Sequence, residues 1–351
     1  MSNCSISCGP ATTAACRQRG MTLVELMVAL LLGLVVTGVV VSVFLASRSS
    51  FKTNMAIGEV QDGSRIAFEL LARDARQAGL TGCGNGTSVS NVLKNGTGNG
   101  GTAWWADWNN AVRGYEKNAD DPAVTEGNAT ANRDASTDSV QLIGIDGAGL
   151  SIQSATANSL TLWSPASDWS NGDALVICDP DHAAVVQLGS GAGTTSLGWV
   201  ATGSNPGNCT TNLGFPVTPP NPPSTTSCSA DPYTFSVNAM VSRLNAVDWY
   251  VGVNPTGGRS LYRQTLTNSG GSIAVTSQEI VRNVSDMQIL YHENGKTDYV
   301  DANDIGNWNA VDAMQVTLTL QSTTKQALTD TNPTPLVRKV STVIALRNRV
   351  S

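Results

Sequence analysis

One run of residues in this chain has the types and spacing to do chemistry. It is Arg19-Gly20-Met21-Thr22-Leu23-Val24-Glu25, which opens an apolar stretch that reaches Ala46. The glycine is a candidate cleavage point, and cleavage after it would create a new amino group on Met21. Glu25 is the only charged residue of the stretch. An acid in a membrane-length helix costs a few kcal/mol and usually has a partner. The Met21 amino group, of this chain or of a neighbouring subunit, could be that partner.

The order of the N-terminal segments differs from that of a secretory signal. Residues 1–20 carry Arg17 and Arg19 and no acid, and we expect them to be a leader peptide. A secretory signal has its apolar core before the cleavage site, whereas here the apolar core follows Gly20. Residues 21–46 are long enough to cross a bilayer as a helix. The alternative is an ordinary single-pass anchor, with the two arginines holding the leader in the cytoplasm.

This segment resembles the class III signal of type IV prepilins and pseudopilins, and Gly20 to Glu25 match it position by position. The resemblance implies that a prepilin peptidase cuts after Gly20 and N-methylates Met21. The chain departs from the family pattern in three ways. Met21 replaces the usual Phe, the leader is long and holds three cysteines, and Ser42 stands where major pilins have a helix-breaking proline.

The helix is expected to continue through residues 47–79. Apolar or small residues recur there at spacings of three and four: Ala56, Val60, Gly63, Ala67, Leu71, Ala75 and Ala78, widened by Ile57, Ile66 and Leu70. Charged residues form another face: Asp62, Arg65, Glu69 and Arg73. An unbroken helix from Met21 would be about 88 Å long, with its amphipathic second half against a head. The alternative is a separate soluble helix after a break at 47–50.

Residues 80–351 are expected to form a globular β-rich head with insertion loops. Short apolar or alternating runs predict strands at Ser139–Ile145, Ser159–Trp163, Ala174–Cys178, Ala183–Leu188, Val247–Val253, Ser260–Leu266, Asp286–Tyr291, Met314–Leu320 and Leu336–Leu346. The stretch Thr81–Arg133 is rich in Gly and Asn and predicts a loop insertion. One long helix followed by mainly antiparallel strands predicts an α+β, pilin-like fold.

Four cysteines remain after the leader, and an even number in an exported chain suggests two disulfides. They are Cys83, Cys178, Cys209 and Cys228. Three connectivities are possible. We favour Cys209 with Cys228, which flank a proline-rich loop at 215–223, and Cys83 with Cys178, which would pin the helix end to the head.

The sequence gives little support for catalysis, cofactors or metals. Two histidines, His182 and His292, leave few options for a nucleophile with a His base. We expect no cofactor and no metal. Residues 301–312 partly match a calcium loop, but Ile305 occupies a ligand position and Asp312 replaces the final Glu, so a polar hairpin loop is favoured. Without the two leader arginines the net charge is -8, and no basic patch predicts nucleic-acid binding.

The tryptophans at 104, 105 and 108 have two interpretations. They could bind a surface or a partner. Such residues more often cover the core of their own domain, and we favour that interpretation.

The C-terminal part resembles the closing segments of PilW-type minor pilins. The segments that carry this resemblance are Val284–Tyr291, Trp308–Val311, Met314–Leu320 and Ser341–Arg349, together with Arg73–Gly79 after the helix. The resemblance implies a role in priming type IV pilus assembly, in a tip complex with other minor pilins, the major pilin and a large tip adhesin. Such pili serve cell adhesion and twitching motility. It also implies insertion in the inner membrane with the head in the periplasm, and later residence in the extracellular pilus.

Two other functions remain open on the sequence alone. A minor pseudopilin of a type II secretion system shares the N-terminal signal and differs in the C-terminal pattern. A membrane-anchored enzyme or surface binding module is a third class. The poverty of His argues against the enzyme, and the tryptophans keep binding open.

Overall fold

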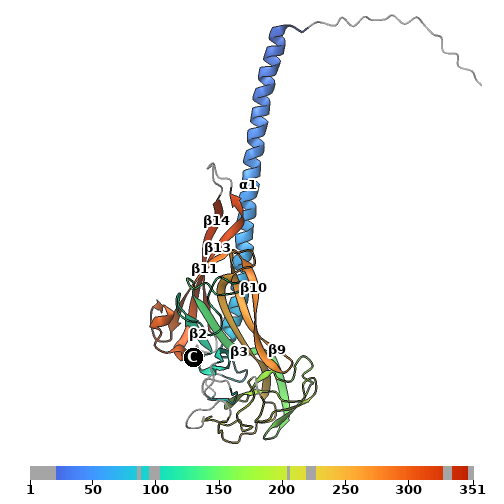
Figure 1. The fold of residues 1–351 in the computed structure, drawn as a ribbon, viewed down its shortest axis with the longest axis vertical. Helices are drawn as coiled ribbons and strands as arrows, with labels where there is room; N and C mark the ends of the chain where they lie inside the picture. Colours follow the sequence, from blue (N-terminus) through green and yellow to red (C-terminus); the bar gives the residue numbers. More distant parts are fainter. Residues whose placement is uncertain are drawn as a thin grey trace, which may run out of the picture.

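The structure is a computed structural model that describes residues 21–84, 88–94, 103–203, 206–218, 227–326 and 334–346. A single long helix, α1 (Leu23–Gln77), projects from a β-rich head like a stalk, and its outer part is clear of the other elements (Figure 1). The α+β prediction is therefore confirmed. The leader 1–20, with the candidate cleavage residue Gly20, lies outside the described residues.

Helix α1 runs without a break over 55 residues, or about 82 Å at 1.5 Å per residue. It starts after Thr22, whose hydroxyl accepts the Glu25 amide N–H at 3.3 Å. It ends where Ala78 is extended and Gly79 takes a φ of 75°. Residues 47–50 are helical, so the alternative of a separate soluble helix is wrong.

The strands form two sheets, a ten-stranded one and a four-stranded one. The larger sheet has β1 (Ser88–Asn91), β2 (Val112–Tyr115), β3 (Ser139–Ala155), β4 (Ser159–Leu162), β5 (Ala174–Cys178), β6 (His182–Gln187), β7 (Ser196–Gly198), β8 (Met240–Val253), β9 (Arg259–Ser269) and β10 (Ser272–Arg282). The smaller has β11 (Val284–Glu293), β12 (Tyr299–Val300), β13 (Val311–Gln326) and β14 (Thr334–Ala345). Among the strands of the described residues, β1 and β6 alone pair in parallel.

All nine predicted strand regions are strands, but several extend further than their sequence signals. β3 continues to Ala155 because Gly147 and Gly149, which interrupt its apolar pattern, form a bulge at which the pairing with β8 shifts between Asp146 and Leu150. β10 was not predicted. It pairs with β9 at the sheet edge and buries few side chains, so it lacks a clear apolar face.

The interpretation of Thr81–Arg133 as a loop insertion is wrong in part. This stretch contains β1, β2 and the 3-10 turns η2 (Trp104–Ala106) and η3 (Trp108–Asn110). Short strands in a Gly- and Asn-rich context give almost no periodic signal. Trp104 and Trp105 are buried among apolar residues of β3, β5 and β8, which confirms that they cover the core of their own domain.

The head has three apolar clusters. The largest lies between α1 and the two sheets, a second lies under the Trp104–Ala106 turn, and a third fills the lobe furthest from the stalk, built by β4 to β7 and the chain up to Val241. Figure 1 shows β13 and β14 along the middle of α1 and that lobe beyond its lower end. The first cluster therefore joins the helix to the head.

The helix ends inside the larger sheet. Along β3, strand β2 pairs with residues 139–142 and β4 with residues beyond 151. Between them Ala78 bridges Gly144, and the Gly79 amide donates to the Ile143 carbonyl at 2.7 Å. A Cβ at position 144 would overlap the carbonyl oxygen of Gln77. Only glycine therefore lets the helix end approach β3 this closely.

We expect Gly144→Ala to destabilise the head because the obstacle is backbone and cannot rotate away. The loss should be about 1–3 kcal/mol, measured by chemical denaturation of the full chain in detergent. Gly84→Ala is the matched control, since no atom lies within 4 Å of its added Cβ. Equal stability of the two variants would contradict the close approach.

Candidate functional site

The outer half of α1 exposes a large apolar surface. The large apolar side chains from Met21 to Leu45 are between 48% and 77% exposed. The most apolar stretch of this helix has a mean hydropathy of 2.8, and the helix is long enough to cross a membrane. An exposed apolar surface of this size marks a membrane or protein contact.

The polar groups in this half are satisfied within the helix. The Thr37 hydroxyl donates to the carbonyls of Gly33 and Leu34 at 2.9 and 3.0 Å, and the Ser42 hydroxyl donates to the Val39 carbonyl at 2.7 Å. These back-bonds let hydroxyls sit in an apolar surface. The helix is continuous at Ser42, where major pilins have proline.

Glu25 is the exception among the polar residues of the outer half. It lies in the first turn of the helix, where the helix dipole favours a negative charge. Its carboxylate contacts no charged group within residues 21–84 or elsewhere in the described parts of the chain. Met21 lies four residues earlier in the sequence, just before the helix begins at Leu23.

The inner half of α1 is fixed to the head by a buried acid. Asp74 is 2% exposed. Its carboxylate accepts two hydrogen bonds from Arg263 of β9, at 2.6 Å from Nε and 3.1 Å from Nη2, and one from the Trp249 indole of β8 at 3.0 Å. A two-pronged arginine contact fixes both distance and orientation.

Sequence reasoning missed the role of Asp74 although a signal was present. Asp74 falls three residues after Leu71 and one before Ala75, on the apolar stripe that faces the head. A charged residue at a position expected to be buried requires a partner. The partners, Arg263 and Trp249, stand on strands nearly 200 residues away, so the sequence did not indicate which residues they were.

Two further contacts align the helix with the smaller sheet. The Glu59 carboxylate accepts the amides of Thr323 and Thr324 in β13, at 2.8 and 3.2 Å, and the Thr324 hydroxyl at 2.8 Å. Burial raises the pKa of Glu59, but these hydrogen bonds outweigh it and leave the pKa lowered. At Gly63 an added Cβ would lie 3.1 Å from Val281 and 3.3 Å from Leu320, so the helix fits between β10 and β13.

The predicted helix faces need two corrections. Ile66 is 49% exposed and does not join the buried stripe. Arg73 approaches Asp74 at 3.7 Å, rather than Glu69. The remaining stripe is right, since six of its seven members are buried: Ala56, Val60, Ala67, Leu71, Ala75 and Ala78.

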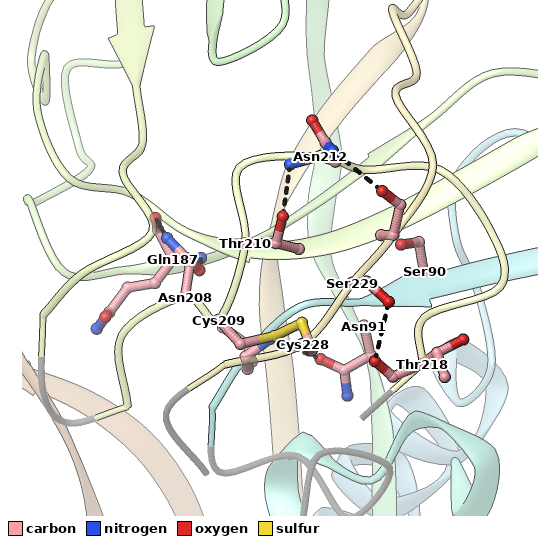
Figure 2. The surroundings of a disulfide bond; sticks show 12 residues. Ser90, Asn91, Gln187, Asn208, Cys209, Thr210, Asn212, Thr218, Cys228 and Ser229 are labelled. Atoms are coloured by element: carbon pink, nitrogen blue, oxygen red, sulfur yellow. Dashed lines mark hydrogen bonds between the residues drawn. A yellow bond between two sulfur atoms is a disulfide. The ribbon is translucent and has the colours of Figure 1, made fainter. Parts of the chain in front are cut away.

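The structure contains two disulfides, and they have the pairing that the sequence favoured. Cys83 joins Cys178, which ties the chain just after the helix to the end of β5. Cys209 joins Cys228 and closes the loop that contains the proline-rich segment. Figure 2 shows this second bridge, and beside it the Ser229 hydroxyl donates to the Thr218 carbonyl at 3.4 Å. The same two residues also pair through backbone hydrogen bonds of 2.8 and 2.9 Å. Residues 219–226 of the loop lie outside the described residues.

The two histidines serve structural contacts. The His182 ring stacks on Tyr233 with ring centres 4.2 Å apart, and its Nε2 contacts the Leu213 carbonyl. His292 Nδ1 lies 2.6 Å from an Asp312 oxygen, which raises the pKa of His292. Asp312 was one of the candidate calcium ligands. Among the described residues, no three His, Cys, Asp or Glu side chains converge as a metal site.

Two family models match this chain, one near each end. The model of the type IV pilus-assembly protein W matches residues 248–348, and that of the prokaryotic N-terminal methylation motif matches residues 16–41. No curated protein and no solved structure matches the chain. Neither match is to an enzyme family. The resemblance to PilW-type pilins, drawn from the same two ends, is thereby confirmed.

We expect Asp74→Ala to cost about 2–4 kcal/mol, because it removes the partner of the Arg263 guanidinium, whose side chain is only 17% exposed, and of the buried Trp249 indole. Denaturant unfolding of the full chain in detergent measures the loss. The control is Asp146→Ala, which removes an exposed ion pair with Arg243 of 2.7 Å and should cost less than about 1 kcal/mol. If the two variants lose similar stability, Asp74 does not fix the helix to the head.

Proposed function

We propose that this chain is a minor pilin that takes part in priming and assembly of the type IV pilus, in a complex at the pilus tip. One observation carries the proposal. A single unbroken helix has an outer half with no cover in the described chain and an inner half fixed to the head at Glu59, Gly63 and Asp74. Such a helix can leave a membrane and pack among other helices without the head unfolding.

The proposed course of assembly follows from the N-terminal residues. A prepilin peptidase cuts after Gly20 and methylates Met21, which leaves residues 21–46 as the membrane helix and 47–79 as its amphipathic continuation. Residues 80–351 form the head, in the periplasm before assembly and outside the cell afterwards. In the growing filament Glu25 pairs with the positively charged N-terminus of a neighbouring subunit, because in an apolar surrounding that pairing removes the cost of the buried charge.

The proposed partners are other minor pilins, the major pilin and a large tip adhesin, as the resemblance implies. A minor pseudopilin of a type II secretion system would use the same N-terminal motif. The match of residues 248–348 to a pilus-assembly family favours the pilus.

Processing can be tested at the cleavage residue. Gly20→Val should leave full-length protein in the membrane, because the peptidase requires a small residue before the bond. Mass spectrometry of the mature wild type should find methylated Met21 as the first residue. Gly33→Val, inside the helix and with open space around it, should be cleaved normally. A mature terminus elsewhere would exclude this processing.

The docking charge can be tested separately. Glu25→Ala should keep membrane insertion and cleavage, because it removes a charge from an apolar helix, and should weaken incorporation into pili. Immunoblots of membrane and sheared-pilus fractions, with counts of pili per cell, measure both steps. Glu69→Ala, on the exposed face of the helix outside the membrane half, is the control. Normal piliation with Glu25→Ala would make the chain a plain membrane anchor with an unrelated head.

A further inference from the structure

A row of polar side chains is buried on the face of the larger sheet that points away from α1. Asp248 of β8 stands opposite Gln141 of β3 on one side and opposite Gln264 of β9 on the other. Asp248 is 0% exposed, Gln141 3% and Gln264 6%. Because the three are direct cross-strand partners on one face, their side chains are neighbours.

The acceptor oxygens in the middle of this row outnumber the side-chain donors that could bind them. Both carboxylate oxygens of Asp248 and the side-chain oxygen of Gln264 are buried and have no side-chain hydrogen-bond donor among the described residues. The amide nitrogen of Gln264 is turned to Ser277 of β10, at 3.5 Å. An ionised Asp248 would therefore present a carboxylate to the side-chain oxygen of Gln264. On its other side, the amide nitrogen of Gln141 already donates to Asp121. A buried carboxylate without donors is costly.

A second buried acid nearby has the opposite environment. Asp121, 2% exposed, accepts hydrogen bonds from the Ala123 amide at 2.9 Å, from Gln141 Nε2 at 2.7 Å and from the Ser139 hydroxyl. All three of these partners are hydrogen-bond donors. Asp121 belongs to residues 116–138, which we call the covering segment because it lies over this face of the sheet.

One cation also faces the row. Arg133 of the covering segment is 0% exposed, and its guanidinium donates to the carbonyls of Glu116, Ala119 and Thr137 and to the Glu126 carboxylate. Its Nε has no partner among the described residues. These bonds commit the guanidinium to the covering segment. The other titratable groups close enough to interact with Asp248 are Tyr115, Tyr250 and Tyr291.

The electrostatics of Asp248 agree with this geometry. Burial raises its pKa well above the usual value, and the nearby Asp121 charge raises it further. Arg133 and the Trp249 amide lower it by less. Two buried carboxylates close together do not both ionise readily.

We propose that Asp248 is protonated in the folded head and shares that proton with Gln264, and that this neutral pair is a pH-sensitive latch for the covering segment. When the proton is lost to solvent, a second buried negative charge faces Asp121. Asp121 is the residue that ties the segment to β3, so the repulsion acts on the tie itself. The segment then opens from the sheet, although its backbone still bonds β8 at Val251 and Val253.

The proposed latch does not depend on the proposed pilus function. It joins one part of the chain that a family model matches to another part that no family model matches. Asp248 is the first residue matched by the pilus-assembly model, whereas the covering segment lies outside both matches. A second acid with a raised pKa lies at the end of the covering segment. Asp138, whose oxygens accept the Lys117 and Ile289 amides at 3.0 and 2.8 Å, has a pKa raised by burial to about 6.

The test compares Asp248→Asn with Asp121→Asn in the full chain in detergent. An acid whose pKa is higher in the folded state lowers stability as the pH rises from its unfolded value, about 3.9, to its folded value. Relative to wild type, the unfolding equilibrium constant of Asp248→Asn should therefore fall about tenfold per pH unit across that range. Asp121→Asn, which replaces an acceptor with a donor, should be less stable than wild type at pH 7.

Hydrogen exchange of the covering segment completes the test. In wild type, the protection factors of amides in the covering segment, residues 116–138, should fall between pH 7 and pH 9, whereas those of Asp248→Asn should stay unchanged. A less stable Asp248→Asn protein at pH 7 would overturn the latch. So would equal pH dependence of the variant and wild type, or recovery of wild-type stability by added calcium, which would indicate a bound cation in place of the proton.

Discussion

The contact on which the rest of the structure depends is that of Asp74 with Arg263 and Trp249. A buried ion pair adds little net stability, because desolvation offsets the attraction. Its effect is to fix the rotation and the axial position of α1 relative to the head. A slip of one residue turns a helix by about 100° and shifts it by about 1.5 Å, which would leave Asp74 and Arg263 buried and unpaired. Some 80 Å of helix separates Met21 from Asp74 at about 1.5 Å per residue, and this contact fixes where that length begins on the head.

The neighbouring contacts turn this one point into a rigid mount. Glu59 binds β13 about one turn before Gly63 reaches β10 and β13, and Ala78 ends the helix against β3. The Cys83–Cys178 bridge then holds the chain that leaves the helix. Together these contacts reach β3, β5, β10 and β13, so both sheets are positioned relative to the same helix. A force on the outer half would thus be shared by both sheets.

The sequence predicts those parts of the structure that depend on periodicity, and fails where partners are distant. The apolar spacing from Ala56 to Ala78 predicted the seat of the helix, and alternation from Met314 to Leu320 predicted a strand with one buried face. In β3 the same reasoning stopped at Ile145, because a bulge at Gly147 and Gly149 looks like a turn when read locally. The environments of Asp74 and Asp248 could not be read locally at all. Each depends on strands brought together by the fold. The place of Asp74 on the apolar stripe indicates that it is buried, but it does not indicate its partners Arg263 and Trp249.

The division of the head into apolar clusters explains how residues that match the pilus-assembly family and residues that do not can share one domain. Strand β8 belongs to both parts. Its second half, with Val247, Trp249 and Val251, faces the helix and lies almost wholly within the matched region, whereas Val241 in its first half belongs to the distal cluster. The distal cluster has its own buried side chains and its own bridge, Cys209–Cys228. The two clusters draw on different parts of β3 and β8. We therefore expect substitutions in the distal lobe to leave the contacts of Asp74 unchanged. The surface that this lobe presents can therefore diverge while the mount of the helix, and with it the geometry of assembly, stays the same.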